Sequence, residues 1–145
     1  MTRADAFVNF TFAVSLLAPV VAFWSLRLPK DTHRKVQLGL LITAWVAVLV
    51  LETKIRLQGG SGSFIAAAPV EVQRLARVVL AVHITGAVLS YAVWTGLVVV
   101  SWRRFQSKLP GVFSRTHRRL GWVVFGGLCF DAVTATAMYV LVFVA

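Results

Sequence analysis

Uncharged, mostly apolar residues form four long stretches along the chain. They cover residues 6–26, 36–51, 78–101 and 120–145, and only Asp131 interrupts the last one. A helix needs about 20 apolar residues to cross the roughly 30 Å hydrocarbon core of a bilayer. Three stretches reach this length, and the second reaches it if its helix continues to Leu57. The pattern predicts an all-α fold, a four-helix transmembrane bundle that forms one domain over residues 1–145. The predicted spans are about 6–28, 36–57, 78–101 and 120–144.

A short basic motif occurs twice, before the second stretch and again before the fourth. Its copies are Thr32-His33-Arg34-Lys35 and Thr116-His117-Arg118-Arg119. The repetition predicts two similar helical-hairpin halves. A threonine just before a helix can accept hydrogen bonds from the first free backbone amides, so both threonines are expected to act as helix caps.

The composition agrees with a membrane protein. Of the 145 residues, 59% are hydrophobic and 14% are charged, and the mean hydropathy is +0.81. A soluble domain of this size is not expected to be so apolar.

The first stretch is long, has no small-residue cleavage site before Trp24, and is followed by more positive charge than precedes it. It is therefore expected to be a retained helix and not a signal peptide. The single cysteine, Cys129, excludes a disulfide framework.

The net charge of +10 first suggests a nucleic-acid partner, but the cations gather between the predicted spans. Ten flank the first and third connections: Arg27, Lys30, Arg34, Lys35, Arg103, Arg104, Lys108, Arg115, Arg118 and Arg119. Five lie on the opposite side: Arg3, Lys54, Arg56, Arg74 and Arg77. Because cytoplasmic connections are enriched in Lys and Arg, both termini are expected on the non-cytoplasmic side. The expected partner is anionic lipid, not nucleic acid.

Several local features carry structural expectations. Residues 58–63 are rich in Gly and Ser and are expected to form a flexible outer loop. Pro69 is expected to start a short interfacial helix that leads into the third span. Gly86 and Ser90 lie four residues apart, where small residues let another helix approach closely.

Asp131 lies near the middle of the fourth span, where a bare charge is costly, so we expect it to be protonated or hydrogen-bonded to a hydroxyl such as that of Thr134.

Two histidines are expected at the cytoplasmic level. His33 and His117 both begin helices that run outward, so the topology places them at one depth. They can be the two axial ligands of a b-type haem held between the second and fourth helices. They can equally be interfacial residues of two basic motifs that contact lipid or a partner. Ligands at the very start of a helix would leave much of a haem outside the apolar core, which favours the interfacial interpretation.

A second group of polar residues is expected at the outer level. By the rise of an α-helix, His83, Glu52, Thr134 and Met138 have similar depth. Imidazole with thioether suits copper, imidazole with carboxylate suits zinc or iron, and either pair can instead relay protons. The structural alternative is an ion pair between Glu52 and Arg56, one helical turn apart.

The chain from about Asp31 to its end resembles a known family, the domain of unknown function 420. The residues that carry the resemblance are Glu52 to Leu57 with Gly59-Gly60, Val82-His83, Ser114 to Arg118 with Gly121-Trp122, Ala132 to Thr134, and Tyr139 to Ala145. The family consists of small four-helix bacterial membrane proteins that include CtaM-like assembly factors of haem-copper terminal oxidases. Its histidines match His33, His83 and His117. This chain departs from the family at Ala135, where the family has Gly after a Val-Thr pair.

The resemblance implies a multi-pass protein of the bacterial inner membrane with a role beside the respiratory chain. The leading hypothesis is maturation of a haem-copper oxidase through an outer-level site at His83 and Glu52. The cofactor is left open, with copper and haem b as the candidates. One alternative is a b-type haem electron-transfer protein. Another is a cofactor-free structural subunit that binds a larger complex, such as a terminal oxidase, through Gly86, Ser90, Gly126 and Gly127. No Ser-His-Asp set is expected at one depth and no zinc-protease motif is present, which disfavours a hydrolytic enzyme. Whether the chain forms a homo-oligomer is left open.

Overall fold

The computed structural model describes residues 4–66, 68–104 and 112–144, and its described elements are all α-helices. They are α1 (Ala6–Ser25), α2 (Lys30–Leu57), α3 (Ser61–Ala66), α4 (Val70–Arg104) and α5 (Val112–Phe143). In this part of the chain, α1, α2, α4 and α5 are long and apolar enough to cross a membrane, as predicted. Arg3, Lys108 and the Leu109-Pro110-Gly111 segment of the third connection lie outside the described residues.

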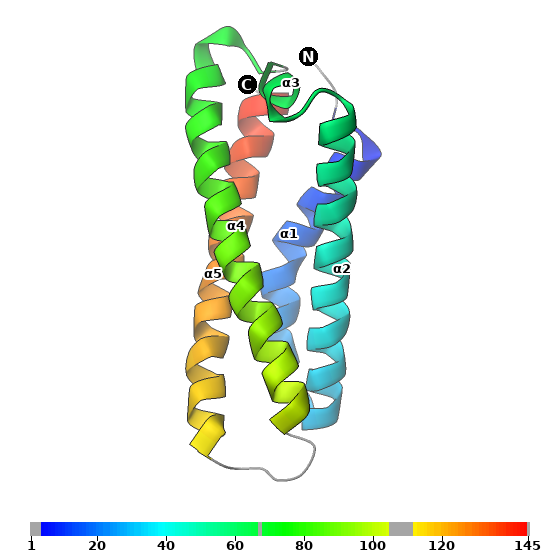
Figure 1. The fold of residues 1–145 in the computed structure, drawn as a ribbon, viewed down its shortest axis with the longest axis vertical. Helices are drawn as coiled ribbons and strands as arrows, with labels where there is room; N and C mark the ends of the chain where they lie inside the picture. The colour runs from blue at the N-terminus through cyan, green and yellow to red at the C-terminus, as the bar shows by residue number, and fades with distance from the viewer. Residues whose placement is uncertain (1–3, 67, 105–111, 145) are drawn as a thin grey trace.

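The four long helices run up and down in a bundle (Figure 1). α1 packs against α2 and α5, and α4 packs against α5 and, more lightly, against α2. This order places α2 and α5 diagonally opposite each other. Both termini and α3 lie at one end, which we call the terminal end. The opposite end contains Ser25, His33, Ser101 and His117, and we call it the histidine end.

Local chemistry sets several helix boundaries. The Asp5 carboxylate caps α1 by accepting hydrogen bonds from the backbone amides of Phe7 at 3.0 Å and Val8 at 3.1 Å. At the end of α2 the chain reverses through Gly59 and Gly60, whose φ angles of 101° and 83° suit a residue without a Cβ. The Gly60 amide then donates to the carbonyl of Ile55 at 2.8 Å, which closes the helix end.

Three helices begin earlier than the apolar pattern predicted. α2 begins at Lys30, α4 at Val70 and α5 at Val112, so the basic residues are part of the helices. Backbone hydrogen bonding continues a helix through charged residues that face water, whereas the apolar stretch marks only its buried length. The expected interfacial helix at Pro69 is thus the first part of α4, and residues 61–63 of the expected flexible loop form the first half of α3.

The expectation that the two motif threonines cap their helices is wrong. Thr32 and Thr116 both lie inside helices, and the residue that precedes α2 is Pro29, which makes no side-chain cap. His33 and His117 are therefore each about one turn inside a helix. They still precede the apolar stretches that begin at Val36 and Leu120, so the longer helices do not move either histidine into the apolar core.

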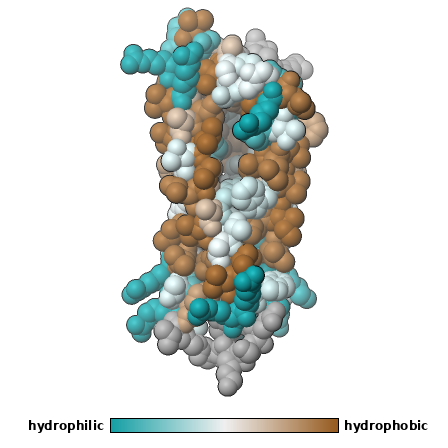
Figure 2. Space-filling view, viewed as in Figure 1, coloured by the Kyte–Doolittle hydropathy of each residue, from teal (hydrophilic) through white to brown (hydrophobic). Residues whose placement is uncertain are grey.

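The outer surface of the bundle is apolar, and several of its buried side chains are small, as expected for a protein surrounded by lipid. Its largest buried cluster is Ala18, Ala22, Leu41, Ala44, Trp94, Leu97, Val124 and Leu128. Many large apolar side chains are exposed, among them Leu17, Val20, Leu49, Val88 and Val133. Figure 2 shows hydrophobic residues, in brown, over the length of the viewed face, with hydrophilic residues, in teal, gathered toward both ends. A patch of this extent fits a surface that contacts lipid.

The interface between α4 and α5 depends on small residues. A Cβ built on Gly86 would overlap the ring of Phe130, and a Cβ on Gly127 would overlap the side chain of Ser90. The close approach predicted from Gly86 and Ser90 is confirmed. These glycines set the distance between the two helices that carry His83, Asp131 and His117.

Candidate functional site

His33 reaches from the first turn of α2 to the last residue of α1. Its Nδ1 lies 3.1 Å from the backbone carbonyl oxygen of Ser25 and 3.1 Å from the Ser25 Oγ. The Ser25 hydroxyl donates to the carbonyl of Ala22 at 2.7 Å, and Nε2 of Gln37 donates to the Ser25 Oγ at 2.8 Å. Ser25 is fully buried, so this arrangement is shielded from solvent.

These contacts determine which nitrogen of His33 carries a proton. A carbonyl oxygen can only accept, so the Nδ1 that lies beside the Ser25 carbonyl must donate. The single hydroxyl proton of Ser25 goes to Ala22, so the Oγ also accepts from Nδ1. A neutral imidazole protonated at Nδ1 presents the lone pair of Nε2. This arrangement, with Nδ1–H held by a carbonyl, is the usual one for a histidine that binds a metal.

A second serine–histidine pair repeats this arrangement in the other half of the chain. The Oγ of Ser101, near the end of α4, lies 2.9 Å from Nδ1 of His117 on α5. Ser101 is 7% exposed and Ser25 is 0% exposed, so both serines are buried. In both halves a buried serine near the end of one helix therefore orients a histidine in the first turns of the next.

The two histidines belong to the same end of the bundle. His33 is in the first turn of α2 and His117 is in the second turn of α5, and these helices lie on opposite corners of the bundle. That the two rings share one depth in the membrane stays a prediction. Two imidazoles on facing helices at one depth are the protein ligands that a b-type haem requires.

A partly buried hydrogen-bond chain connects the first pair to the core. Gln37 donates to the Ser25 Oγ and accepts at its Oε1 from the indole Nε1 of Trp94 at 3.2 Å. Trp94 is 1% exposed and belongs to the main hydrophobic cluster. The orientation of His33 is thus coupled to a side chain nearly three turns from the end of α4.

The four residues expected at the outer level do not all contact one another. His83 Nδ1 lies 2.7 Å from the Oγ1 of Thr134, which joins α4 to α5. The Glu52 Oε1 accepts from Nε of Arg56 at 2.6 Å, so the ion pair weighed as the structural alternative is present. Met138 is buried in a small cluster with Ala68 and Val142.

No three His, Cys, Asp or Glu side chains within residues 4–66, 68–104 and 112–144 are grouped so that they could hold a metal ion. Of the expected outer-level residues, the structure brings His83 and Thr134 together, and it pairs Glu52 with Arg56. Copper or zinc at His83, Glu52 and Met138 stays a prediction.

Asp131 is buried at the α4–α5 interface. Its side chain is 5% exposed, and neither carboxylate oxygen has a hydrogen-bond partner in the part of the chain that the structure describes. The expected bond from Thr134 is not formed, because that hydroxyl contacts His83 and the carbonyl of Phe130. Ser90 lies close to the carboxyl, but its hydroxyl donates to the carbonyl of Gly86 at 2.8 Å.

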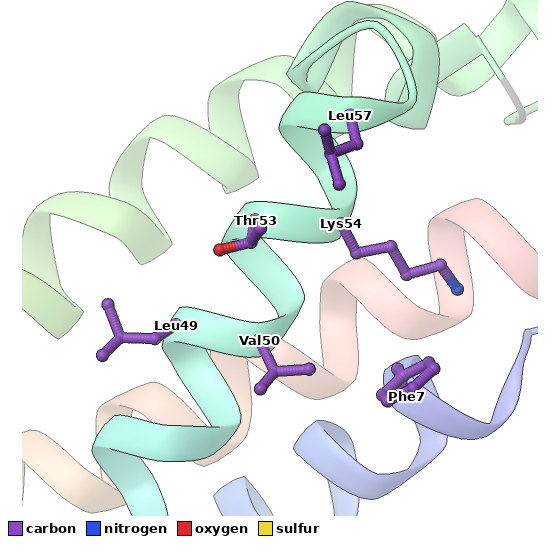
Figure 3. Close-up of a pocket in the computed structure, with 6 residues that line it drawn as sticks. All are labelled: Phe7, Leu49, Val50, Thr53, Lys54 and Leu57. Carbon is purple, nitrogen blue, oxygen red and sulfur yellow. The ribbon is translucent and has the colours of Figure 1, made fainter.

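An apolar groove lies between α1 and α2 at the terminal end (Figure 3). It is lined by Phe7, Leu49, Val50, Thr53, Lys54 and Leu57. Lys54 forms an ion pair with Asp5 and points toward the ring of Phe7. The groove contains none of the candidate histidines, and its lining suits a lipid chain more than a polar substrate.

The partners of the two histidines were not expected from the sequence. One signal was available: a serine beside a tryptophan ends the first helix of each half, as Trp24-Ser25 and Ser101-Trp102. Comparisons of the chain with protein-family models, with curated proteins and with solved structures find no match.

Proposed function

We propose that this chain is a multi-pass protein of the bacterial inner membrane that assists the maturation of a haem-copper respiratory oxidase, and that it holds a b-type haem between His33 and His117. The haem proposal rests mainly on the two serine–histidine pairs at one end of the bundle. The oxidase proposal rests on the resemblance described above. The histidine end would be cytoplasmic, in agreement with the excess of basic residues there.

The residues at the histidine end fit a haem in their donor chemistry. His33 offers the lone pair of Nε2 because its Nδ1–H is bound to the Ser25 carbonyl. His117, on the helix diagonally opposite that of His33, is held by Ser101 of the neighbouring α4. Residues that orient a ligating histidine commonly change metal affinity by about 10- to 100-fold when they are removed. A bound haem would supply one-electron chemistry, or would be the cargo of a maturation factor.

The absorption spectrum of the purified protein tests the haem proposal. The wild-type protein is expected to show a Soret band, which His33→Ala and His117→Ala should each remove. His83→Ala is the matched control, because it removes a histidine on another part of the bundle, and it should keep the band. A colourless wild-type protein, reconstituted with haem and still colourless, would refute haem binding. So would a band that survives both substitutions.

A second experiment separates maturation from the alternative roles. If the protein assists assembly, cells without it should have less active oxidase, and a copy with His117→Ala should fail to restore it. An electron-transfer protein would instead leave oxidase content unchanged and slow electron flow. A cofactor-free structural subunit would co-purify with the oxidase, and its His117→Ala variant would restore activity fully.

The outer-level metal site is a second candidate, supported by the partly buried contact between His83 and Thr134. Elemental analysis tests it directly. Copper, zinc or iron retained by the wild-type protein and lost in His83→Ala, but kept in His117→Ala, would favour this site. Equal metal content in the two variants would argue against it.

A further inference from the structure

The two ends of the bundle differ in how their charges are paired. Both ion pairs formed among the described residues, Lys54 with Asp5 and Arg56 with Glu52, lie at the terminal end. The helix ends that meet at the histidine end contain nine described basic residues and one acidic residue, Asp31. The basic residues are Arg27, Lys30, Arg34, Lys35, Arg103, Arg104, Arg115, Arg118 and Arg119. This end therefore has a large excess of unpaired positive charge.

Arg34 has a defined position within this group. Its guanidinium carbon lies 4.1 Å from the ring centroid of Trp102, so the cation on α2 stacks on an aromatic ring of α4. Its Nε is buried and has no hydrogen-bond partner in the described part of the chain. Because this Nε has almost no accessible surface, an acceptor from outside the bundle would bind the terminal nitrogens of the guanidinium.

The surroundings of Arg34 indicate what kind of acceptor fits. Val99, one turn before Trp102 and on nearly the same face of α4, is a 44% exposed apolar side chain. An anion bound to Arg34 would have an apolar surface on one side and the basic residues on the other. A phospholipid has this combination, with a phosphate head and acyl chains.

We infer that Arg34, stacked on Trp102, binds the phosphate of an anionic phospholipid whose acyl chain lies along α4 beside Val99. A guanidinium matches the oxygens of a phosphate with two parallel N–H donors, and the tryptophan ring holds the guanidinium in one orientation. The site does not depend on haem, so it is expected to remain in His117→Ala.

Lipid binding by the intact protein in detergent, measured by native mass spectrometry, tests this inference. The wild-type protein is expected to bind phosphatidylglycerol in preference to phosphatidylcholine. Arg34→Gln should weaken phosphatidylglycerol binding about fivefold, the effect of removing one juxtamembrane cation worth about 1 kcal/mol. Phosphatidylcholine binding should not change. Trp102→Leu keeps every charge and should weaken phosphatidylglycerol binding as well, because the guanidinium loses its support.

Arg56→Gln is the matched control. It removes an arginine from the same helix, at the opposite end, where Glu52 already neutralises it. It should leave phosphatidylglycerol binding unchanged. Equal losses of phosphatidylglycerol binding in Arg34→Gln and Arg56→Gln would mean that only net charge matters. Unchanged phosphatidylglycerol binding in Arg34→Gln would refute a lipid site at this residue. Inorganic phosphate should not compete with the lipid; if it binds alone with the same dependence on Arg34, the site serves free phosphate and the lipid assignment is wrong.

Discussion

The indole N–H of Trp94 donates to the Oε1 of Gln37 across the α2–α4 interface, at 3.2 Å. Trp94 is 1% exposed, and Gln37 also donates to Ser25, which holds His33. A partly buried polar chain thus runs from the core to a candidate ligand. Such chains are stabilising only when each donor has an acceptor, so the loss of one member affects the others.

Removal of the Gln37 side-chain amide should destabilise the protein. Gln37→Leu leaves the buried indole N–H of Trp94 without an acceptor, which is expected to cost about 1–3 kcal/mol. The measurement is thermal or denaturant unfolding in detergent, followed by circular dichroism. The double variant Gln37→Leu with Trp94→Phe removes both partners and should recover part of the loss. A double variant that is less stable than the sum of the two single changes would contradict this account.

Two neighbouring glycines of α5 should respond differently to alanine. A methyl group on Gly127 would overlap the Ser90 side chain, so Gly127→Ala is expected to cost about 1–3 kcal/mol through overpacking. Gly126 has no atom within 4 Å of its Cβ position, so Gly126→Ala should be neutral or should stabilise the helix by up to about 1 kcal/mol. Unfolding measurements on both variants decide this. Adding Ser90→Gly should rescue Gly127→Ala and leave Gly126→Ala without benefit.

Most of the fold could be predicted because membrane spans follow from one simple property. The length of an apolar stretch determines whether it can cross a bilayer, and α2 does continue to Leu57 as expected. The starts of α2, α4 and α5 could not be found in the same way. Only the part of a helix inside the hydrocarbon core must be apolar. Polar residues that precede this part can also be helical, so the sequence shows no change in polarity where the helix begins.

The candidate site was predictable only in part. The placement of His33 and His117 at the same end of the bundle followed from helix direction and the repeated motif. Their serine partners did not, since the sequence does not give the rotation of one helix about its axis relative to the next. The same uncertainty explains Thr134, which was expected to bond Asp131 and instead contacts His83. Depth is a one-dimensional quantity, whereas a hydrogen bond also needs direction.

Loss of the charge on Asp131 should not destabilise the protein. Its carboxylate oxygens have no hydrogen-bond partner in the described part of the chain, and a charge buried in this way is unfavourable. Asp131→Asn keeps the volume and is expected to unfold at the same temperature or a higher one. Asp5→Asn is the control: it can keep the helix cap but loses the ion pair with Lys54, so a loss of up to about 1 kcal/mol is expected. A clear decrease in the stability of Asp131→Asn would reveal a specific partner of the carboxylate.

The two serines should contribute unequally to the histidines they hold. Ser25 contacts His33 through both its hydroxyl and its backbone carbonyl, and Ser25→Ala leaves the carbonyl in place. Ser101 contacts His117 through its hydroxyl, which Ser101→Ala removes. We therefore expect Ser101→Ala to disturb its histidine more.

Nitrogen NMR of labelled histidine measures this difference without any cofactor. His33 should remain protonated at Nδ1 in both the wild type and Ser25→Ala, whereas the Nδ1 and Nε2 signals of His117 should shift in Ser101→Ala. If haem binds as proposed, its affinity should fall about tenfold or more in Ser101→Ala and less in Ser25→Ala. A His33 that is protonated at Nε2 in the wild-type protein would contradict the assigned hydrogen bond to the Ser25 carbonyl, because an unprotonated Nδ1 cannot donate to it.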